Sequence, residues 1–237
     1  MAVLKRKKTP PTVRFFKISS TSDTAKTLRA AGRETFVVAA CQITGRGRNA
    51  RSFSSEKGGL YLSYLCFPEK LSAKKAFGLI ASAAVAVCKT LERFSLHPTI
   101  KWPNDVYVSG KKICGILTEN TLTDGYVKDS VIGVGVNVNN RLDDSLAEIA
   151  TTMRAELGKR VCLRKVEKLL KEQLLLSTSM DEYFAHLRYL GEVELLEGGK
   201  RYAAFAEKVD EDGGLVVVVN GQRQKKTAAE ISLRMKG

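Results

Sequence analysis

Three observations predict an α+β protein with a mixed or antiparallel sheet, covering helices and a second, small all-β domain. Strand-like apolar runs alternate with helical patterns up to Leu187. After Tyr189 the chain changes to short strand-like runs joined by E-G-G, D-E-D-G-G and N-G, which are turn sequences. The length of 237 residues suits one large and one small domain. We predict a disordered basic tail over 1–13, the large domain over 14–188 and a small β-barrel over 189–237.

The N-terminal half of the large domain is predicted to alternate strands and helices. Capping residues at Ser20–Asp23 precede an expected helix. A second, longer helix is expected to be capped near Ser72 and to end in a basic turn. The expected strands are Arg14–Ile18, Thr35–Gln42 and Leu60–Phe67, and the expected helices are Asp23–Ala31 and Leu71–Phe94.

The second half begins with strands that bring polar residues and glycines together. Asn137 falls on the same face of its strand as Gly133 and Gly135, because residues two apart point the same way. The turns Ser109–Gly110 and Asp124–Gly125 predict hairpins. Within Ile100–Val108, Pro103 is expected to stop a strand and fix a turn. The expected strands after it are Lys111–Thr118 and Val131–Val138, the expected helices are Leu146–Leu157 and Leu163–Leu187, and the small domain is expected to use Glu192–Glu197, Tyr202–Val209, Leu215–Val219, Gln222–Thr227 and Glu230–Arg234.

Composition narrows the classes of function. The formal net charge of +14 indicates attraction to anions, but the basic residues are dispersed along the chain. The chain has no helix-turn-helix signature, zinc-finger spacing or aromatic RNA-binding box, so we predict no specific DNA binding. The longest nearly apolar run, Phe77–Cys88, is too short to cross a bilayer, which needs about 20 residues. Nucleotide and acidic protein partners fit this charge pattern.

Cysteine and histidine usage argues against two kinds of catalysis. The five cysteines form no C-x-x-C pair, which is typical of a reducing compartment, and we expect the cytoplasm. Only His97 and His186 are available as a base for a cysteine nucleophile or as metal ligands, and neither has the required spacing. The basic tail, with K-R-K-K near its start, leaves an organellar address as the alternative.

Two polar stretches carry the functional signal. Thr44–Ser55 reads T-G-R-G-R-N-A-R-S-F-S-S, and its glycines and arginines suit a loop that closes over a polyanionic ligand. The same composition also marks solvated or RNA-contacting loops, so this stretch alone leaves both open. Ile100–Val108 reads I-K-W-P-N-D-V-Y-V, where Pro103 fixes a rigid corner that presents Lys, Asn and Asp together. That combination favours a functional site over an ordinary turn.

These stretches together resemble the biotin protein ligases, the family that includes holocarboxylase synthetase. The matching pieces occur in family order: S-T-S at Ser20–Ser22, Gln42 before G-R-G-R-N-A-R-S-F, L-Y-L-S, K-W-P-N-D, K-I-C-G-I-L, G-V-G-V-N-V and a terminal E-I-S-L-R. The resemblance covers about residues 14–237. It implies a catalytic domain like that of class II aminoacyl-tRNA synthetases and a C-terminal SH3-like barrel.

The resemblance also implies a two-step reaction and its residues. MgATP and biotin give biotinyl-5′-AMP, and the biotinyl group then passes to a lysine of a biotin carboxyl carrier domain. The implied catalytic residues are Arg48, Lys112, Asp105, Asn104 and Lys101. The implied biotin pocket is Ser20, Thr21, Ser22, Gln42, Gly45, Arg46, Arg48, Lys112, Gly115, Leu117 and Gly133. The implied ATP and adenylate contacts are Gly45, Arg46, Gly47, Arg48, Arg51, Phe53, Asn104, Lys112, Asn137 and Arg234. No side-chain metal cluster is expected, since Mg²⁺ would arrive with ATP; a homodimer is possible.

Departures from the family pattern and alternative functions accompany this prediction. Ala50 replaces a usual glycine, Phe53 a usual tryptophan and Ser22 a usual asparagine. The family's N-terminal DNA-binding module is not expected, because the first strand begins after about a dozen residues. The enzymatic alternative is a lipoate or octanoyl ligase, whose R-x-S-G-G-G loop and following histidine are missing here. A non-catalytic biotin- or RNA-binding protein is the alternative of another class.

Overall fold

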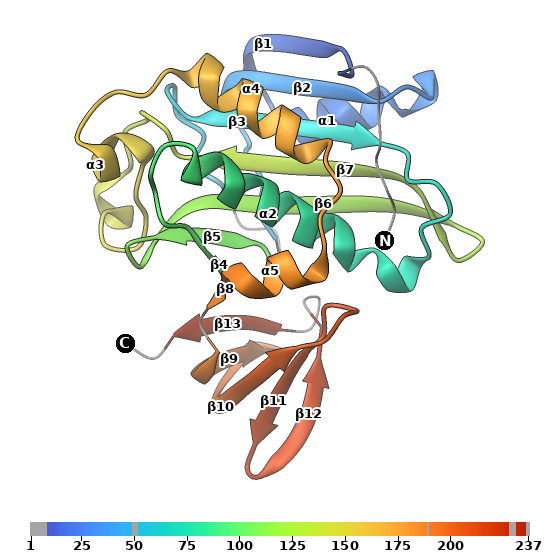
Figure 1. Ribbon diagram of the computed structural model, residues 1–237, viewed down its shortest axis with the longest axis vertical. Coiled ribbons are helices and arrows are strands. Elements are labelled where there is room, and N and C mark those ends of the chain that lie inside the picture. The colour runs from blue at the N-terminus through green and yellow to red at the C-terminus, as the bar shows by residue number, and fades with distance from the viewer. Residues whose placement is uncertain (1–8, 49–51, 189, 228–230, 236–237) are drawn as a thin grey trace.

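The computed structural model describes residues 9–48, 52–188, 190–227 and 231–235, and it arranges them as two β-sheets with helices on the larger one (Figure 1). The larger sheet has eight strands in the order β1-β2-β3-β7-β6-β5-β4-β8. Parallel pairing joins β1 to β2 and β4 to β8, and all other neighbours are antiparallel. The predicted mixed sheet is therefore confirmed. Its strands are β1 (Thr12–Ile18), β2 (Thr35–Gln42), β3 (Leu60–Cys66), β4 (Thr99–Lys101), β5 (Asp105–Val108), β6 (Lys111–Thr123), β7 (Tyr126–Val136) and β8 (Leu187–Arg188).

Side-chain alternation gives this sheet two different faces. Phe36 and Leu62 lie on the face covered by α2 and α4 and are fully buried in the main core, and Lys171 of α4 lies over the Phe36 ring. Val37 and Leu65 point the opposite way and pack with Ala25 of α1. Residues next to one another along a strand thus face opposite sides, as the pleat requires. The helices are α1 (Thr21–Thr27), α2 (Phe77–Glu92), α3 (Met153–Leu157), α4 (Leu163–Leu174) and α5 (Met180–His186).

Four predicted helices have different bounds in the structure. The first ends at Thr27 and is followed by a separate 3₁₀ turn, Arg29–Ala31. Leu71–Phe94 is a 3₁₀ turn followed by α2, because Ala73 donates its backbone N–H to Gly125 of the β6–β7 hairpin (2.8 Å). Ser72 makes no side-chain cap, so that prediction was wrong.

The other two predicted helices are interrupted. In Leu146–Leu157 only the last turn is α-helical, because Lys112 donates its backbone N–H to Ile149 (2.9 Å) and accepts from Thr151 (2.9 Å), which draws this segment onto β6. Leu163–Leu187 divides into α4 and α5, since Ser179 forms a capping box with Glu182 and starts a new helix.

The smaller sheet is antiparallel, with five strands in the order β12-β11-β10-β9-β13. Its β11–β12 turn is Asn220–Gly221, with both residues at positive φ, as the N-G signal predicted. The small β domain is confirmed as a sheet; β12 and β13, its two ends, are not paired with each other within the described ranges. Its strands are β9 (Gly191–Glu197), β10 (Lys200–Val209), β11 (Leu215–Val219), β12 (Gln222–Lys226) and β13 (Ile231–Met235).

The smaller sheet packs directly against the corner between β4 and β5. The indole Nε1 of Trp102 donates a hydrogen bond to the carbonyl of Gly213 (3.0 Å). The Phe77 ring fills the place next to Gly213, where an added Cβ would lie 2.0 Å from its Cγ. Apolar residues of both sheets form one continuous buried cluster. The predicted boundary near residue 188 therefore falls between two sheets that share a core.

No helix in the described part of the chain combines the length and apolar character needed to cross a membrane.

A buried ion cluster fastens the edge strand β1 to α4. Glu167 accepts two hydrogen bonds from Arg14 (2.7 and 2.8 Å) and one from Lys171, which also donates to Thr12 (2.8 Å). The Glu167 and Lys171 side chains are 8% and 9% exposed. Burial would raise the pKa of Glu167, but the hydrogen bonds from Arg14 and Lys171 outweigh burial and lower it.

We therefore predict a pH-dependent cost for Glu167→Gln. At pH 7 the variant should lose about 3 kcal/mol of unfolding free energy, because Lys171 keeps a buried charge without its partner. Since the folded pKa lies below the unfolded value of about 4.3, this stabilisation is present above that pH and is lost as pH falls through the folded pKa. Urea unfolding of both proteins from pH 7 to pH 3 should show the gap closing; a constant gap would contradict the assignment.

Candidate active site

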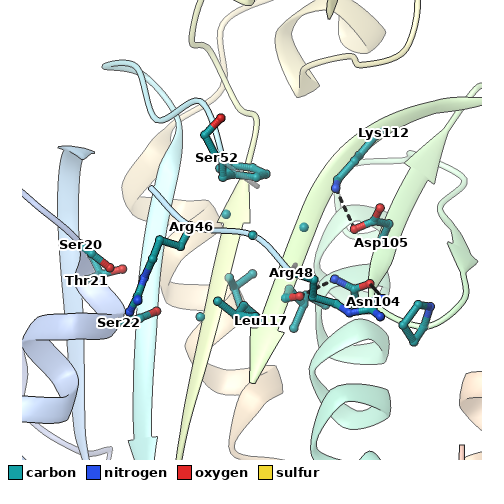
Figure 2. A pocket seen from close by; sticks show the side chains of 18 of the residues that line it. Ser20, Thr21, Ser22, Arg46, Arg48, Ser52, Asn104, Asp105, Lys112 and Leu117 are labelled. Atoms are coloured by element: carbon teal, nitrogen blue, oxygen red, sulfur yellow. Dashed lines mark hydrogen bonds and ion pairs between the residues drawn. The ribbon is translucent and has the colours of Figure 1, made fainter. Parts of the chain in front are cut away.

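A cavity of about 300 Å³ lies on the face of the large sheet that carries α1 (Figure 2). This volume is at the lower end of the range for small-molecule sites, about 300–1,000 Å³. The cavity is bounded by the start of α1, the arginine loop (Thr44–Ser55), the β4–β5 corner and the central strands β6 and β7. Segments far apart in sequence therefore converge here.

Hydroxyl and amide groups line the end near α1. Ser20 caps α1 by accepting a hydrogen bond from the Asp23 N–H (3.3 Å). Of the polar residues Ser20–Asp23, it is therefore the one with a capping role. Thr21 has a different role: its N–H and Oγ1 both donate to Gln42 Oε1 (2.8 and 3.0 Å). Ser63 of β3 donates to Thr21 Oγ1 (2.8 Å) and contacts Ser22 Oγ (3.0 Å). This end can exchange several hydrogen bonds with a polar, uncharged ligand group.

Glycines make the floor of the cavity flat. An added Cβ at Gly133 would lie 2.7 Å from Ser22 Oγ, and one at Gly135 would lie 2.5 Å from the Phe53 ring. At Gly115 the same ring would be 3.1 Å away. The Phe53 ring thus lies against bare backbone of β6 and β7, as the glycine-lined strand predicted. It also meets the Tyr61 ring edge-on, with centroids 6.5 Å apart.

Cationic side chains occupy the opposite end, each next to a polar partner from the β4–β5 corner. Lys112 Nζ lies 2.8 Å from Asp105 Oδ1, and Arg48 Nη1 donates to Asn104 Oδ1 (3.2 Å), as Figure 2 shows. Asn104 is held in place because its Nδ2 donates to the Ile116 carbonyl (2.6 Å). The ammonium and guanidinium can bind negative charge, and the carboxylate can accept a proton.

The arginine loop crosses the cavity between these two ends. Its base is anchored by backbone hydrogen bonds from Ile43 to Ile18 and from Phe53 to Gly45 (2.9 and 2.8 Å). The Gly45 backbone is so close to its neighbours that a Cβ would lie 2.3 Å from the Phe53 carbonyl oxygen. A side chain at this position would push the two arms of the loop apart.

Most of the predicted site residues line this one cavity. They are Ser20, Thr21, Ser22, Gln42, Arg46, Gly47, Arg48, Phe53, Lys101, Asn104, Asp105, Lys112, Gly115, Leu117 and Gly133. Gly45 does not line the cavity and shapes the loop base instead. Asn137 does not line it either: its side chain is buried and accepts from Asn140 (3.1 Å). Arg51 and the side chain of Arg234 lie outside the described residues, so their predicted contacts stay predictions.

Some cavity residues were not among the predicted site residues. These are Ser52, Trp102, Pro103, Tyr107, Ile116, Val134 and Gly135. Gly135 had a usable signal, since it lies two residues from Gly133 on the same strand face. Tyr107 had one as well, because it lies two residues beyond Asp105, and Lys101 Nζ lies 3.4 Å from its hydroxyl.

The cavity suits neither thiol chemistry nor a metal held by protein side chains. Burial raises the pKa of the Cys114 thiol, which lies behind the floor beside Gly115. Over the described ranges, His, Cys, Asp and Glu side chains form no group of three that could hold a metal ion. Asp105 is the carboxylate among the cavity residues. That donor set fits Mg²⁺ carried mainly by phosphate oxygens, which is how this ion usually binds with nucleotides.

Comparison with known proteins places the chain in a family. The model of the biotin/lipoate A/B protein ligase family matches residues 15–137, which include every segment of the cavity wall. The chain therefore belongs to the biotin/lipoate A/B protein ligase family. It is 39% identical over 151 residues to the bifunctional ligase/repressor BirA of Bacillus spizizenii, covering 61% of this chain. The chain spans about half, 46%, of the length of that curated relative.

Two other matches extend over nearly the whole chain. A biotin–[acetyl-CoA-carboxylase] ligase from Paracoccus denitrificans is 26% identical over 241 residues, covering 90% of this chain and 96% of its own length. A solved biotin protein ligase from Aquifex aeolicus, in complex with biotin and ATP, superposes with a TM-score of 0.78 at 26% identity, covering 95% of this chain and 99% of the other. The resemblance to biotin protein ligases is thus confirmed.

We predict that Gly45→Ala will disturb the loop base. The added methyl group would collide with the Phe53 carbonyl, and overpacking of this kind costs about 1–3 kcal/mol of unfolding free energy. Gly78→Ala is the matched control, because nothing lies within 4 Å of its added Cβ, and a helical alanine is favoured over glycine. Urea unfolding should show a loss for the first variant and no loss for the second. Equal stability of Gly45→Ala and the native protein would contradict the close approach.

Proposed function

We propose that the protein is a biotin protein ligase, which activates biotin with ATP and then transfers it to a lysine of a carboxylase carrier domain. The observation that carries this proposal is the polarity of the cavity: hydroxyl and amide groups at one end, and Arg48, Lys112 and Asp105 at the other. A ligand with an uncharged polar ring and a carboxylate tail matches both ends. The whole-length similarity to a ligase solved with biotin and ATP supports the same assignment.

In the first step a biotin carboxylate oxygen attacks the α-phosphorus of ATP. The bond from that phosphorus to the bridging oxygen breaks, and pyrophosphate leaves. Arg48 and Lys112 neutralise negative charge on the carboxylate and the α-phosphate, which is the main requirement of phosphoryl transfer. Lys112 lies ready for this because Asp105 holds its ammonium at the cavity edge. Mg²⁺ would supply further charge neutralisation on the phosphates, with Asp105 and Asn104 as the nearest oxygen donors.

In the second step the amine of an acceptor lysine attacks the acyl carbon of biotinyl-5′-AMP. The bond between that carbon and the phosphate oxygen breaks, an amide forms, and AMP leaves. The attacking amine must first lose a proton, and Asp105 is the cavity's carboxylate for this role. When Lys112 moves onto the acyl phosphate, Asp105 loses its ion-pair partner and becomes available. The loop and Phe53 cover the adenylate and limit its contact with water.

The described residues that line the cavity include neither a cysteine nor a histidine that could form a nucleophile–base pair, which agrees with direct attack by the two substrates. The cytoplasmic location, the lack of specific DNA binding and the lack of a repressor function stay predictions, and the choice between monomer and homodimer stays open.

We predict that the protein catalyses biotin-dependent exchange of labelled pyrophosphate into ATP. Lipoate in a parallel reaction tests the sister activity, since the family model covers both kinds of ligase. Exchange with biotin alone supports the proposal, and exchange with lipoate alone would replace it. Lys112→Ala should reduce exchange by at least about 100-fold, because it removes a charge aimed at the developing phosphate charge. Normal exchange by this variant would remove Lys112 from its role.

We also predict a step-specific loss for Asp105→Asn. Adenylate formation should slow much less than transfer, because the asparagine amide oxygen can still accept from Lys112. Transfer to a carrier-domain lysine should slow by about 10²- to 10⁴-fold, the range for loss of a general base. Single-turnover transfer from preformed biotinyl-5′-AMP measures the second step alone. Raising the pH should restore much of the rate, because more of the lysine is then already deprotonated. An equal loss in both steps would assign Asp105 to phosphate or metal binding instead.

A further inference from the structure

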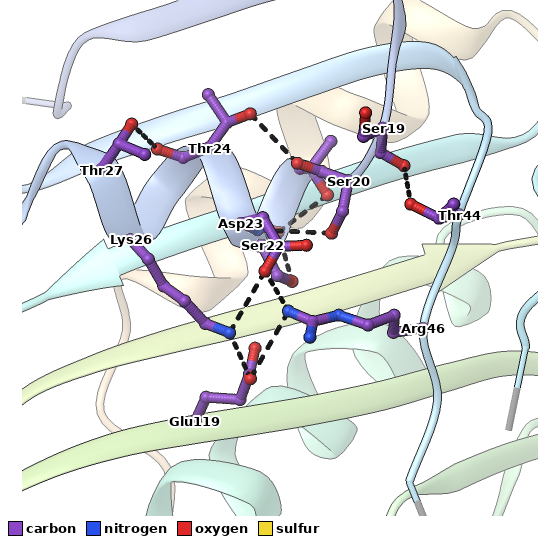
Figure 3. A network of polar contacts seen from close by, with 12 residues as sticks. Ser19, Ser20, Ser22, Asp23, Thr24, Lys26, Thr27, Thr44, Arg46 and Glu119 are labelled. Carbon is purple, nitrogen blue, oxygen red and sulfur yellow. Dashed lines mark hydrogen bonds and ion pairs between the residues drawn. The ribbon is translucent and has the colours of Figure 1, made fainter. Parts of the chain in front are cut away.

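Arg46 is held outside the charged end of the cavity by residues of α1 and β6 (Figure 3). Its Nη2 contacts Asp23 Oδ1, and Glu119 Oε1 lies 3.7 Å away. Lys26 contacts the same two oxygen atoms, at 3.3 Å from Asp23 Oδ1 and more closely at Glu119 Oε1. Two cations therefore share two carboxylates, and one of the cations belongs to the arginine loop.

Glu119 is only partly satisfied by this arrangement. Its Oε2 is buried and has no hydrogen-bond partner in the described part of the chain. A buried carboxylate oxygen without a donor costs free energy, so Glu119 favours any cation that approaches it. Arg46 brings a cation from the loop to 3.7 Å from the other oxygen of this carboxylate, Oε1.

The two described arginines of the loop are thus fixed to opposite walls of the cavity. Arg46 is paired with carboxylates on the α1 side, while Arg48 donates to the neutral amide oxygen of Asn104. One residue, Gly47, separates them, and the Arg46 backbone also bridges to Ser52. The charge of Arg46 is already neutralised in this conformation. The hydrogen bond from Arg48 to Asn104 is one that an incoming anion can replace, since a charged partner outcompetes a neutral one.

We propose that Asp23 and Glu119 are positioning residues that act through Arg46. They tie the start of the arginine loop across the cavity and leave Arg48 and Lys112 to receive the ligand's negative charge. Arg46 then acts as a fastening, meaning an ion-pair contact that fixes the start of the loop to α1 and β6. The family resemblance instead implied that Arg46 contacts the ligand. The identity of the ligand rests on the proposed function, but the fastening itself does not.

Trypsin cleavage of the ligand-free protein tests this proposal, because the loop contains Arg46, Arg48 and Arg51 as cleavage sites. Cleavage follows the population of the open loop when opening is fast. Asp23→Asn and Glu119→Gln should each speed loop cleavage about twofold to fivefold, the range that exposed ion pairs give, and the double variant should exceed either. The wild-type rate should rise with salt, which screens such pairs, whereas the double variant should respond little.

Lys26→Met is the matched control. It removes a cation from the same carboxylates but leaves Arg46 as their remaining partner, so loop cleavage should not increase. Cleavage of the double variant at the wild-type rate would overturn the proposal. Equal acceleration by Lys26→Met would also overturn it, because the cluster would then act by holding α1 against the sheet. If the double variant does not fold, the single variants Glu119→Gln and Arg46→Gln replace it in the comparison. For Arg46→Gln, cleavage is measured at Arg48 and Arg51.

Biotin dissociation gives the readout that connects the fastening to the ligand. Dissociation should be about twofold to fivefold faster from Asp23→Asn than from the wild type, and unchanged or slower from Lys26→Met. Unchanged dissociation together with faster cleavage would overturn the positioning role at the ligand. If the wild type binds no biotin, the proposed function fails, while the trypsin comparison still decides whether the fastening exists.

Discussion

The cavity depends on gathering several cations in one place without forcing them apart. Like charges repel strongly where water is partly excluded, so each cation needs a partner before any ligand arrives. The structure gives each of these cations its own partner. Lys112 contacts Asp105, Arg48 donates to Asn104, and Arg46 lies next to Asp23 and Glu119. The partners come from different elements, so the mixed sheet has to bring α1, β5 and β6 to one face. Charge compensation thus connects the fold to the site.

A second constraint is the space above the sheet. Side chains on a strand normally fill the first few ångströms above its backbone, and at Gly115, Gly133 and Gly135 they are missing. Phe53 and Ser22 approach the backbone closely there, which places aromatic and hydroxyl groups on the same bare surface. The side chains of the neighbouring residues Ile132 and Val134 belong to the main core on the opposite face of the sheet. One strand therefore serves the core with one face and the cavity with the other.

Local sequence signals predicted where most strands lie but not all of their bounds. The first strand begins at Thr12, inside the tail predicted as disordered, because it pairs with β2; β6 and β7 extend further toward their shared turn than predicted, and β8 was not predicted. β2 and β11 have the predicted bounds, and all three N-G, D-G and S-G turns form hairpins with positive φ. Helix bounds were predicted less well, since they depend on partners distant in sequence. The break before α3 arises from backbone hydrogen bonds to Lys112, and the turn before α2 arises from a bond to Gly125. Neither partner can be found from a helical repeat.

The site could be predicted largely because its residues cluster in two short motifs and one glycine-rich strand. The motifs did not indicate which partner each charged side chain would have in the folded protein. Arg46 and Arg48 are equivalent in the sequence G-R-G-R, yet one meets carboxylates and the other an amide. That difference comes from Asp23 and Glu119, and the second of these lies more than 70 positions away along the chain. Residue type thus predicted that both arginines could bind anions, and tertiary contacts determined which of them pairs with carboxylates in the protein itself.

The hydrogen bond from Trp102 to Gly213 has a consequence for cooperativity. Trp102 lies in the same corner as Asn104 and Asp105, which line the cavity, and its indole bonds to the smaller sheet. Phe77 of α2 packs at the same glycine, Gly213. A chain shortened before β9 would leave a buried indole N–H without an acceptor and apolar surface open to water. The β4–β5 corner and the smaller sheet should therefore unfold as one thermodynamic unit, and the C-terminal sheet supports one wall of the cavity.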